Sequence, residues 1–179
     1  MYSKILREKR GRRSFLFFID VESMIEKATI KDIVEQLVKE TDLFLVDVIV
    51  RAGNIIIVEV DSDSEGVSID DCITLSKKIE SQLDRDIEDF ELEVGSAGIT
   101  SPFKIPRQYK KNWGNEVEVL TKDGQKLSGI LKSSDESQFT FTTTKMVKPE
   151  GAKKKVAVEE DFTFNYDEVK YTKYLIRFK

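Results

Sequence analysis

The chain has 179 residues, of which 40% are hydrophobic and 35% charged, and its formal net charge is −4. This composition favours a soluble globular protein, and no apolar stretch approaches the roughly 20 residues that cross a bilayer. One cysteine cannot form an intrachain disulfide, and the absence of histidine excludes Cys/His and Ser/His nucleophile pairs and the usual zinc sites. We therefore expect a cytoplasmic protein without a zinc site, whereas its abundant carboxylates leave an acid/base pair open.

The first 23 residues are basic, with six basic and three acidic side chains, and their FLFFI stretch imitates a secretory signal. That stretch, residues 15–19, is shorter than the roughly seven residues that a signal core needs, and no small-residue cleavage site follows it. We expect residues 1–23 to be a disordered extension, or part of an overlong reading frame whose start is Met24. An RNA-seeking arm is the alternative interpretation.

Residues 24–97 read as an acidic α/β domain. Apolar residues at helical spacing predict a helix over residues 28–40, with Thr29 and Asp32 as its start signal. The β-branched runs LFLVDVIVR and IIIVEV flank a loop containing Gly53, which predicts an antiparallel hairpin. A second helix begins at Ser68 with Asp71 as its capping partner, and FELEVG forms a third strand. The order α-β-β-α-β leaves two helices to cover one face of a sheet.

The connection DSDSEGVSIDDC, residues 61–72, matches the front half of an EF-hand calcium loop. The match fails at the twelfth position, where Cys72 replaces a bidentate glutamate, and a strand precedes the loop where a helix is required. A solvated acidic connection followed by a helix cap is the favoured interpretation. Cys72 itself is expected to be a small core residue.

Residues 98–106 are expected to form a rigid linker, because Pro102 and Pro106 restrict the backbone and Gly98 can adopt a positive φ. The interdomain junction is assigned to Ser96, Gly98 and Pro102.

About five strands follow in residues 107–179, including a hairpin at the pair Asp123-Gly124. So many strands in a short segment favour a small barrel of the SH3 or Sm type, which closes its edges. The whole chain is thus predicted to be α+β.

Charge divides at the same boundary. Residues 24–95 carry 7 basic and 19 acidic side chains, a net charge of −12, whereas residues 96–179 carry 16 basic and 11 acidic side chains, a net charge of +5. A basic barrel is suited to RNA phosphates. The candidate RNA-binding residues form two groups, one at the start of the barrel and one in a later loop: Lys104, Arg107, Lys110 and Lys111, and Lys153, Lys154 and Lys155.

Two features of this candidate RNA surface have alternative interpretations. Trp113, close to the first group, either stacks on a base or belongs to the barrel core. The lysine-rich loop, which also contains Lys145 and Lys148, is either a finger that contacts RNA or a solvated hairpin end. The acidic domain has its own pair of interpretations, since it either holds a basic protein partner or only keeps the chain soluble.

Three stretches of the sequence together resemble the bacterial ribosome maturation factor RimP family. They are EGVSIDDCITLSKKIE, LEVGSAGITSPFK and VEVLTKDGQKLSGILK. The resemblance covers Met24 to Lys179. It implies a monomeric, non-enzymatic factor with no catalytic residue, metal site or cofactor. Such a factor binds the free or immature small (30S) ribosomal subunit, assists its late assembly and leaves before translation. The implied partners are 16S-type rRNA and a basic ribosomal protein near the decoding region. At the junction, Thr100 and Ser101 stand where the family motif has Asp and Arg, so contacts made through those charges are absent here.

Two other classes of function are kept as alternatives. A general Sm-like RNA-binding module would assemble into rings through free barrel edges. A metal-dependent nuclease would need Asp61, Asp63 and Asp70 to converge on one ion.

Overall fold

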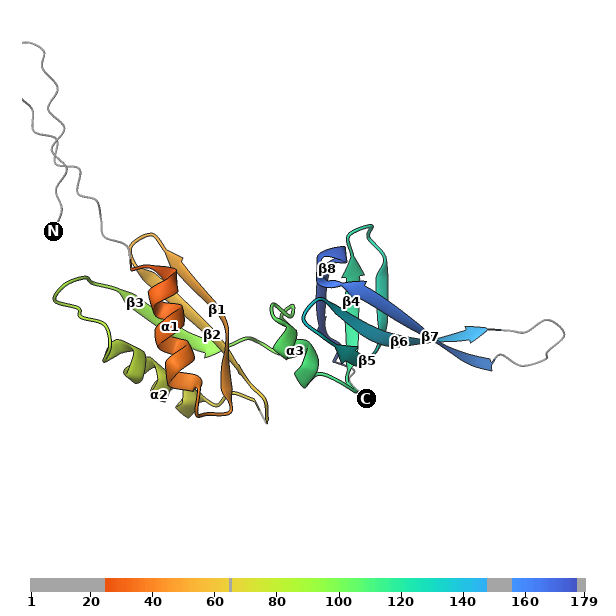
Figure 1. Cartoon of the computed structure of the whole chain (residues 1–179), viewed down its shortest axis with the longest axis horizontal. Helices are drawn as coiled ribbons and strands as arrows, with labels where there is room; N and C mark the ends of the chain where they lie inside the picture. The colour runs from red at the N-terminus through yellow and green to blue at the C-terminus, as the bar shows by residue number, and fades with distance from the viewer. Residues whose placement is uncertain (1–24, 65, 148–155, 177–179) are drawn as a thin grey trace, which may run out of the picture.

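The computed structural model describes residues 25–64, 66–147 and 156–176, which form two sheets with a short helix between them (Figure 1). The described helices include none that is long and apolar enough to span a membrane. The α+β class and the order α-β-β-α-β are confirmed. The elements run as follows: α1 (Lys27–Val38), β1 (Leu43–Arg51), β2 (Ile55–Ser62), α2 (Ile69–Glu80), β3 (Glu91–Ser96), α3 (Pro106–Lys111), β4 (Glu116–Thr121), β5 (Lys126–Ser134), β6 (Gln138–Val147), β7 (Val156–Asn165), the 3-10 helix η1 (Tyr166–Glu168) and β8 (Val169–Tyr174).

The N-terminal sheet has the order β1-β2-β3, and α1 and α2 cover one of its faces (Figure 1). The predicted hairpin is confirmed, since β1 pairs antiparallel with β2 and places Val48 opposite Val58. β3 then pairs parallel with β2, which requires the crossover through α2. The core under the helices is fully apolar, with Ile30, Ile56 and Ile79 inaccessible to solvent.

The two helices of this unit begin differently. Ser68 and Asp71 form the predicted capping box, in which Ser68 Oγ accepts from the Asp71 backbone N–H at 3.1 Å and Asp71 Oδ2 accepts from the Ser68 N–H at 2.9 Å. The expected start of the first helix at Thr29 was wrong, because Glu26 occupies the N-cap position and no side chain caps it. The preceding Ile25 N–H donates to the Asn54 side chain at 3.1 Å instead, so a tertiary contact positions the chain where the helix begins.

The other face of the N-terminal sheet is acidic. Because side chains alternate along a strand, the core positions Val58 and Val60 leave Glu59 and Asp61 of β2 on the face opposite the helices. Asp47 of β1 is paired with Glu59 and shares that face. Phe44 of β1 is only 3% exposed although it does not belong to the core under the helices. Another part of the chain must therefore cover this end of the sheet.

The C-terminal strands form one antiparallel sheet with the order β7-β6-β5-β4-β8, and η1 connects the two edge strands. This is the strand order of a small SH3-like barrel, as predicted. The predicted turn between β4 and β5 is also present, with Gly124 at a φ of 92°. Buried Val117, Leu131 and Phe141 lie in the barrel core. Figure 1 shows that the β6–β7 ribbon continues outward beyond the barrel.

Helix α3 is part of the barrel body, because its Tyr109 lies in the barrel core with only 4% of its surface exposed. Three rings surround Tyr109, with centroid distances of 5.1 Å to Phe103, 4.9 Å to Phe139 and 4.9 Å to Tyr166. Burial raises the pKa of the Tyr109 hydroxyl to about 12. Gln108 of the same helix is buried as well. The helix therefore has a fixed orientation relative to the barrel, and its basic side chains extend from a rigid base.

A close backbone approach in the barrel provides a test of this packing. A Cβ atom at Gly129 of β5 would lie 2.1 Å from the Thr142 carbonyl oxygen of β6. We expect Gly129→Ala to lower the free energy of unfolding by roughly 1–3 kcal/mol, the usual cost of overpacking, as measured by urea denaturation. The control is Gly95→Ala in β3, where an added Cβ meets nothing within 4 Å. Equal stability of the two variants would contradict the β5–β6 register.

Candidate nucleic-acid interface

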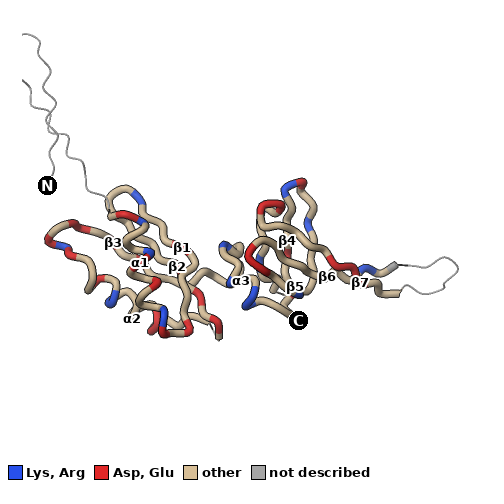
Figure 2. The backbone as a smooth tube through the Cα atoms, viewed as in Figure 1, with Lys and Arg blue, Asp and Glu red and all other residues tan. Residues whose placement is uncertain are grey.

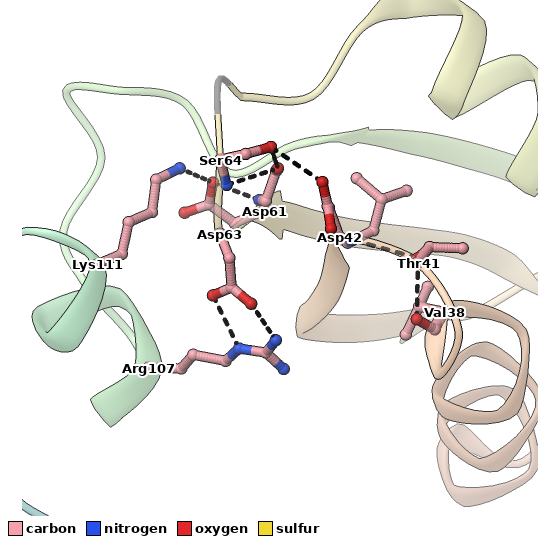
Figure 3. Close-up of polar contacts among 10 residues, drawn as sticks. Val38, Thr41, Asp42, Asp61, Asp63, Ser64, Arg107 and Lys111 are labelled. Atoms are coloured by element: carbon pink, nitrogen blue, oxygen red, sulfur yellow. Dashed lines mark hydrogen bonds and ion pairs between the residues drawn. The ribbon is translucent and has the colours of Figure 1, made fainter.

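The first group of predicted RNA-binding residues lies in one short segment that ends in α3. Pro106 starts the helix, and the Lys104 N–H donates to the Gln108 side-chain oxygen at 2.8 Å, so the entry to the helix is held locally. Since residues four apart share one side of a helix, Arg107 and Lys111 lie together. Tyr109 is directed into the barrel, and the two cations are directed toward the N-terminal sheet (Figure 3).

Arg107 bridges the two parts of the chain. Its Nε donates to Asp63 Oδ1 at 3.1 Å and its Nη2 donates to the other oxygen of the same carboxylate, which is a bidentate pair (Figure 3). The guanidinium also lies over the Phe44 ring, 4.4 Å from its centroid. Arg107 is therefore one of the groups that cover Phe44, and it combines a fork-like ion pair with a cation–π contact.

Two lysines extend the same contact. Lys111 Nζ lies 2.6 Å from Asp61 Oδ1, and the two side chains are only 22% and 19% exposed. Lys104 Nζ lies 2.7 Å from Glu59 Oε2 and 3.0 Å from Asp47 Oδ2. We call this set the ion-pair seam; it comprises the cations Lys104, Arg107 and Lys111 and the carboxylates Asp47, Glu59, Asp61 and Asp63. Figure 2 shows the basic residues of α3 beside the acidic end of the first sheet.

The electrostatics of the seam favour the charged forms of its members. The hydrogen bond from Arg107 lowers the pKa of Asp63. Burial alone would raise the pKa of Asp47, but the hydrogen bonds from Lys104 and Lys27 outweigh it and lower the pKa. The hydrogen bond to Glu59 raises the pKa of Lys104. Partly exposed pairs of this kind typically contribute about 0.2–1 kcal/mol each and weaken in salt, so the seam is a labile contact.

The junction is anchored at both of its ends. The Ala97 N–H donates to the Val60 carbonyl of β2 at 2.9 Å, and the Phe103 N–H donates to the Thr172 carbonyl of β8 at 2.8 Å. Between these anchors, the Ser101 N–H donates to the Gly98 carbonyl at 2.9 Å and forms a turn. The expectation that this turn uses a positive φ at Gly98 was wrong, since the positive-φ glycines of the described residues are at other positions.

The remaining candidates differ in their surroundings. Lys110 is exposed and forms no ion pair with the described residues. Trp113 is not in the barrel core, because 43% of its surface is exposed and its Nε1 donates to Ser134 Oγ at 3.0 Å. Lys145 is paired with Glu160 at 2.7 Å. Lys148 and the second group, Lys153, Lys154 and Lys155, lie outside the described residues.

The acidic residues considered for a metal-dependent enzyme have other roles in the structure. Asp61 and Asp63 are bonded to Lys111 and Arg107, while Asp70 lies in the first turn of α2. Within the ranges that the structure describes, no group of three or more potential ligand residues is placed to hold a metal ion. Glu65, the fifth position of the calcium-loop pattern, lies outside those ranges.

Sequence reasoning missed the acidic half of the seam. Asp47 and Glu59 appear in the sequence only as polar positions that alternate with apolar ones. Their shared seam cation, Lys104, lies 57 and 45 residues further along the chain. The one signal that pointed toward such a contact was the opposite net charge of the two halves. A pattern of charge does not reveal which residues meet.

The amino-acid sequence was compared with known families and proteins. The RimP N-terminal domain family matches residues 33–100. A protein named Ribosome maturation factor RimP from Porphyromonas gingivalis is 44% identical over 147 residues, covering 82% of this chain and 96% of the relative. Proteins of the same name are 38% identical in Christiangramia forsetii, covering 85% of this chain and 99% of the relative, and 36% identical in Flavobacterium psychrophilum, covering 77% and 90%.

The pKa shifts predict that acid opens the seam. An aspartate whose pKa falls below its ordinary 3.8 in the closed form stabilises that form above pH 3.8. This stabilisation is lost as the pH falls through the lowered value. Small-angle X-ray scattering should therefore show a larger radius of gyration below pH 3.8, at a pH where circular dichroism still shows both folded parts. A constant radius throughout that range would contradict the assignment of the closed form to Asp47 and Asp63.

Proposed function

The chain belongs to the RimP family of ribosome maturation factors, and from this membership we propose that it binds the free or immature small (30S) ribosomal subunit. In this proposal it assists the late assembly of that subunit in the cytoplasm and leaves before translation begins. The observation that carries the proposal is 44% identity to a curated relative over 82% of the chain. A match over 147 of the 179 residues extends well beyond residues 33–100, so the likeness is not confined to the N-terminal family match.

The proposed mode of action is binding without catalysis. Two of the three carboxylates that a metal-dependent enzyme would need, Asp61 and Asp63, already form ion pairs with cations of α3. Carboxylates neutralised in this way are poor metal ligands and weak general bases, because a competing cation must first be displaced. This arrangement supports a protein whose activity consists of its contacts with the subunit.

The two sheets suggest a division of labour on the subunit. The barrel would face 16S-type rRNA, with exposed Lys110 near phosphates and exposed Trp113 available for stacking on a base. The acidic N-terminal sheet would face a basic ribosomal protein near the decoding region. The proposed phosphate contacts are Lys104, Arg107, Lys110, Lys111, Lys153, Lys154 and Lys155.

We further propose that residues 24–97 and 107–179 are separate domains joined by a rigid linker over residues 98–106. The support is that each sheet has its own apolar core. Anchors at Ala97 and Phe103 leave few residues free between the sheets. A linker of this kind restricts the range of angles between the two binding surfaces and reduces the ordering cost of engaging both. Ser96, Gly98 and Pro102 are the proposed determinants of that restriction.

A monomer fits the proposal better than a ring. Rings of Sm-like barrels form when an edge strand of one barrel pairs with an edge strand of the next. In this chain the Thr172 carbonyl of the edge strand β8 already accepts from the Phe103 N–H at 2.8 Å. The junction therefore occupies part of the edge that a neighbouring barrel would need.

The proposed function predicts selective binding to one ribosomal particle. Sedimentation through a sucrose gradient should recover the protein with free small subunits and leave it depleted from large subunits and from translating ribosomes. The physical reason is that a maturation factor must recognise surfaces which later become covered. Equal recovery with small subunits and with translating ribosomes would exclude a maturation role.

The phosphate contacts predict a salt dependence. Each phosphate neutralised by a basic side chain contributes close to one unit to the slope of log affinity against log salt, and about 0.7 for single strands. Arg107→Ala, Lys110→Ala and Lys111→Ala combined should therefore reduce the slope by roughly 2–3 units in filter-binding assays with rRNA fragments.

The matched control removes the same types of charge from the acidic unit, as Arg51→Ala, Lys77→Ala and Lys78→Ala combined. Its slope should stay close to that of the wild type. If both triple variants show the same slope, the RNA surface does not include α3.

A further inference from the structure

The ion-pair seam occupies three of the four cations that the first group offers to RNA. Lys104, Arg107 and Lys111 all contact carboxylates of the N-terminal sheet, and only Lys110 of that group is left without an ion pair among the described residues. The pairs come from a single segment and meet a single end of the sheet. They therefore form and break together as one contact between the two parts of the chain.

The carboxylates hold these cations in the way that phosphates would. The guanidinium of Arg107 meets both oxygens of Asp63, and the same fork binds two oxygens of a phosphate. Lys111 and Asp61 are both largely buried by the contact, so a polymeric anion cannot reach Lys111 while Asp61 is in place. Carboxylate and phosphate are thus alternative partners for the same donors.

We propose that the ion-pair seam is an autoinhibitory latch, in which the carboxylates of the N-terminal sheet act as internal substitutes for RNA phosphates. This inference rests on the proposed function, because it assumes that RNA meets the basic side chains of α3. Of the first group, the closed form offers only Lys110 to RNA, and the open form offers all four cations. RNA binding and closure of the seam compete.

The fold provides for such an opening. Tyr109 in the barrel core and the Phe103 N–H on β8 keep α3 with the barrel when the seam breaks. Ala97 remains with the N-terminal sheet through its bond to Val60. The change of angle then falls on residues 98–102, between the two anchors, and the linker limits the size of this change without preventing it. The cations move as a rigid group, so their spacing for phosphates is preserved.

The expected size of the effect follows from the number of pairs. Each partly exposed ion pair shifts the equilibrium between the open and closed forms by up to about fivefold. Three paired cations together therefore favour the closed form by roughly three- to hundredfold. The apparent RNA affinity equals the affinity of the open form multiplied by the fraction of molecules that are open. We therefore expect the latch to weaken RNA binding by about tenfold at moderate salt.

The test removes the carboxylates and keeps every cation. The latch variant combines Asp47→Asn, Glu59→Gln, Asp61→Asn and Asp63→Asn, which are close in shape to the native side chains. The control variant removes four negative charges elsewhere on the same unit, at positions without an ion pair among the described residues: Asp32→Asn, Asp70→Asn, Asp86→Asn and Glu91→Gln. The probe is oligouridylate, and affinities are measured by fluorescence anisotropy.

The latch variant should bind oligouridylate about tenfold more tightly than the control variant, which has the same net charge. Equal affinity of the two variants, whether high or low, would overturn the latch. That result leaves the proposed function intact, since the function is judged by sedimentation of the wild type with small subunits. Loss of that sedimentation overturns the function and, with it, the biological role of the latch.

A second measurement does not depend on the amide variants folding. In a Cys72→Ser background, Asp63→Cys and Arg107→Cys are joined by a bifunctional maleimide, which holds the seam closed. The reference is the same protein blocked with a single-arm maleimide. The linked form should bind oligouridylate several-fold more weakly, because Lys104 and Lys111 stay against carboxylates. Identical affinity of the linked and blocked forms would overturn the latch.

Discussion

The burial of Tyr109 in the barrel core is the constraint on which the arrangement of the whole chain depends. One aromatic side chain, packed among the rings of Phe103, Phe139 and Tyr166, fixes a helix of six residues to the barrel. Because that helix is fixed, Arg107 and Lys111 leave the barrel in one direction only. That direction leads to the acidic end of the N-terminal sheet.

The contact that results is strong enough to orient the two sheets and weak enough to be replaced. Its pairs are hydrogen bonded and charge assisted, with Lys111 and Asp61 about a fifth exposed and the others more open to water. Water and salt limit the contribution of each pair, as in other surface ion pairs. A densely charged polymer such as RNA offers many phosphates at once, and it competes for these cations far better than a simple salt.

The sequence was sufficient for features that depend on neighbours in the chain. The capping box of Ser68 and Asp71, the hairpin around Gly53 and the turn at Asp123-Gly124 all follow from local chemistry, and all are present. Sequence motifs also indicated the RimP family, and a relative with 44% sequence identity confirms this assignment.

The sequence was insufficient where distant residues decide the structure. The first helix begins at Lys27 and not near Thr29, because the Asn54 side chain holds Ile25. Trp113 is half exposed beside Ser134, although its position near a first strand suggested the core. The partners of Lys104 and Arg107 lie more than 40 residues away, so no local pattern identifies them. Cations that the sequence assigned to RNA are bonded within the chain.

The central claim is that the seam must open before the barrel binds RNA fully. The most direct measurement is the distance between the two sheets, in a chain whose seam residues are all unchanged, while RNA is added. A donor dye on Cys72 of α2 and an acceptor dye on a cysteine introduced at the exposed Lys122 report this distance by energy transfer. The account predicts that transfer falls as oligouridylate saturates the protein and returns when the RNA is digested. Transfer that stays constant through saturation, with RNA demonstrably bound, would contradict the account.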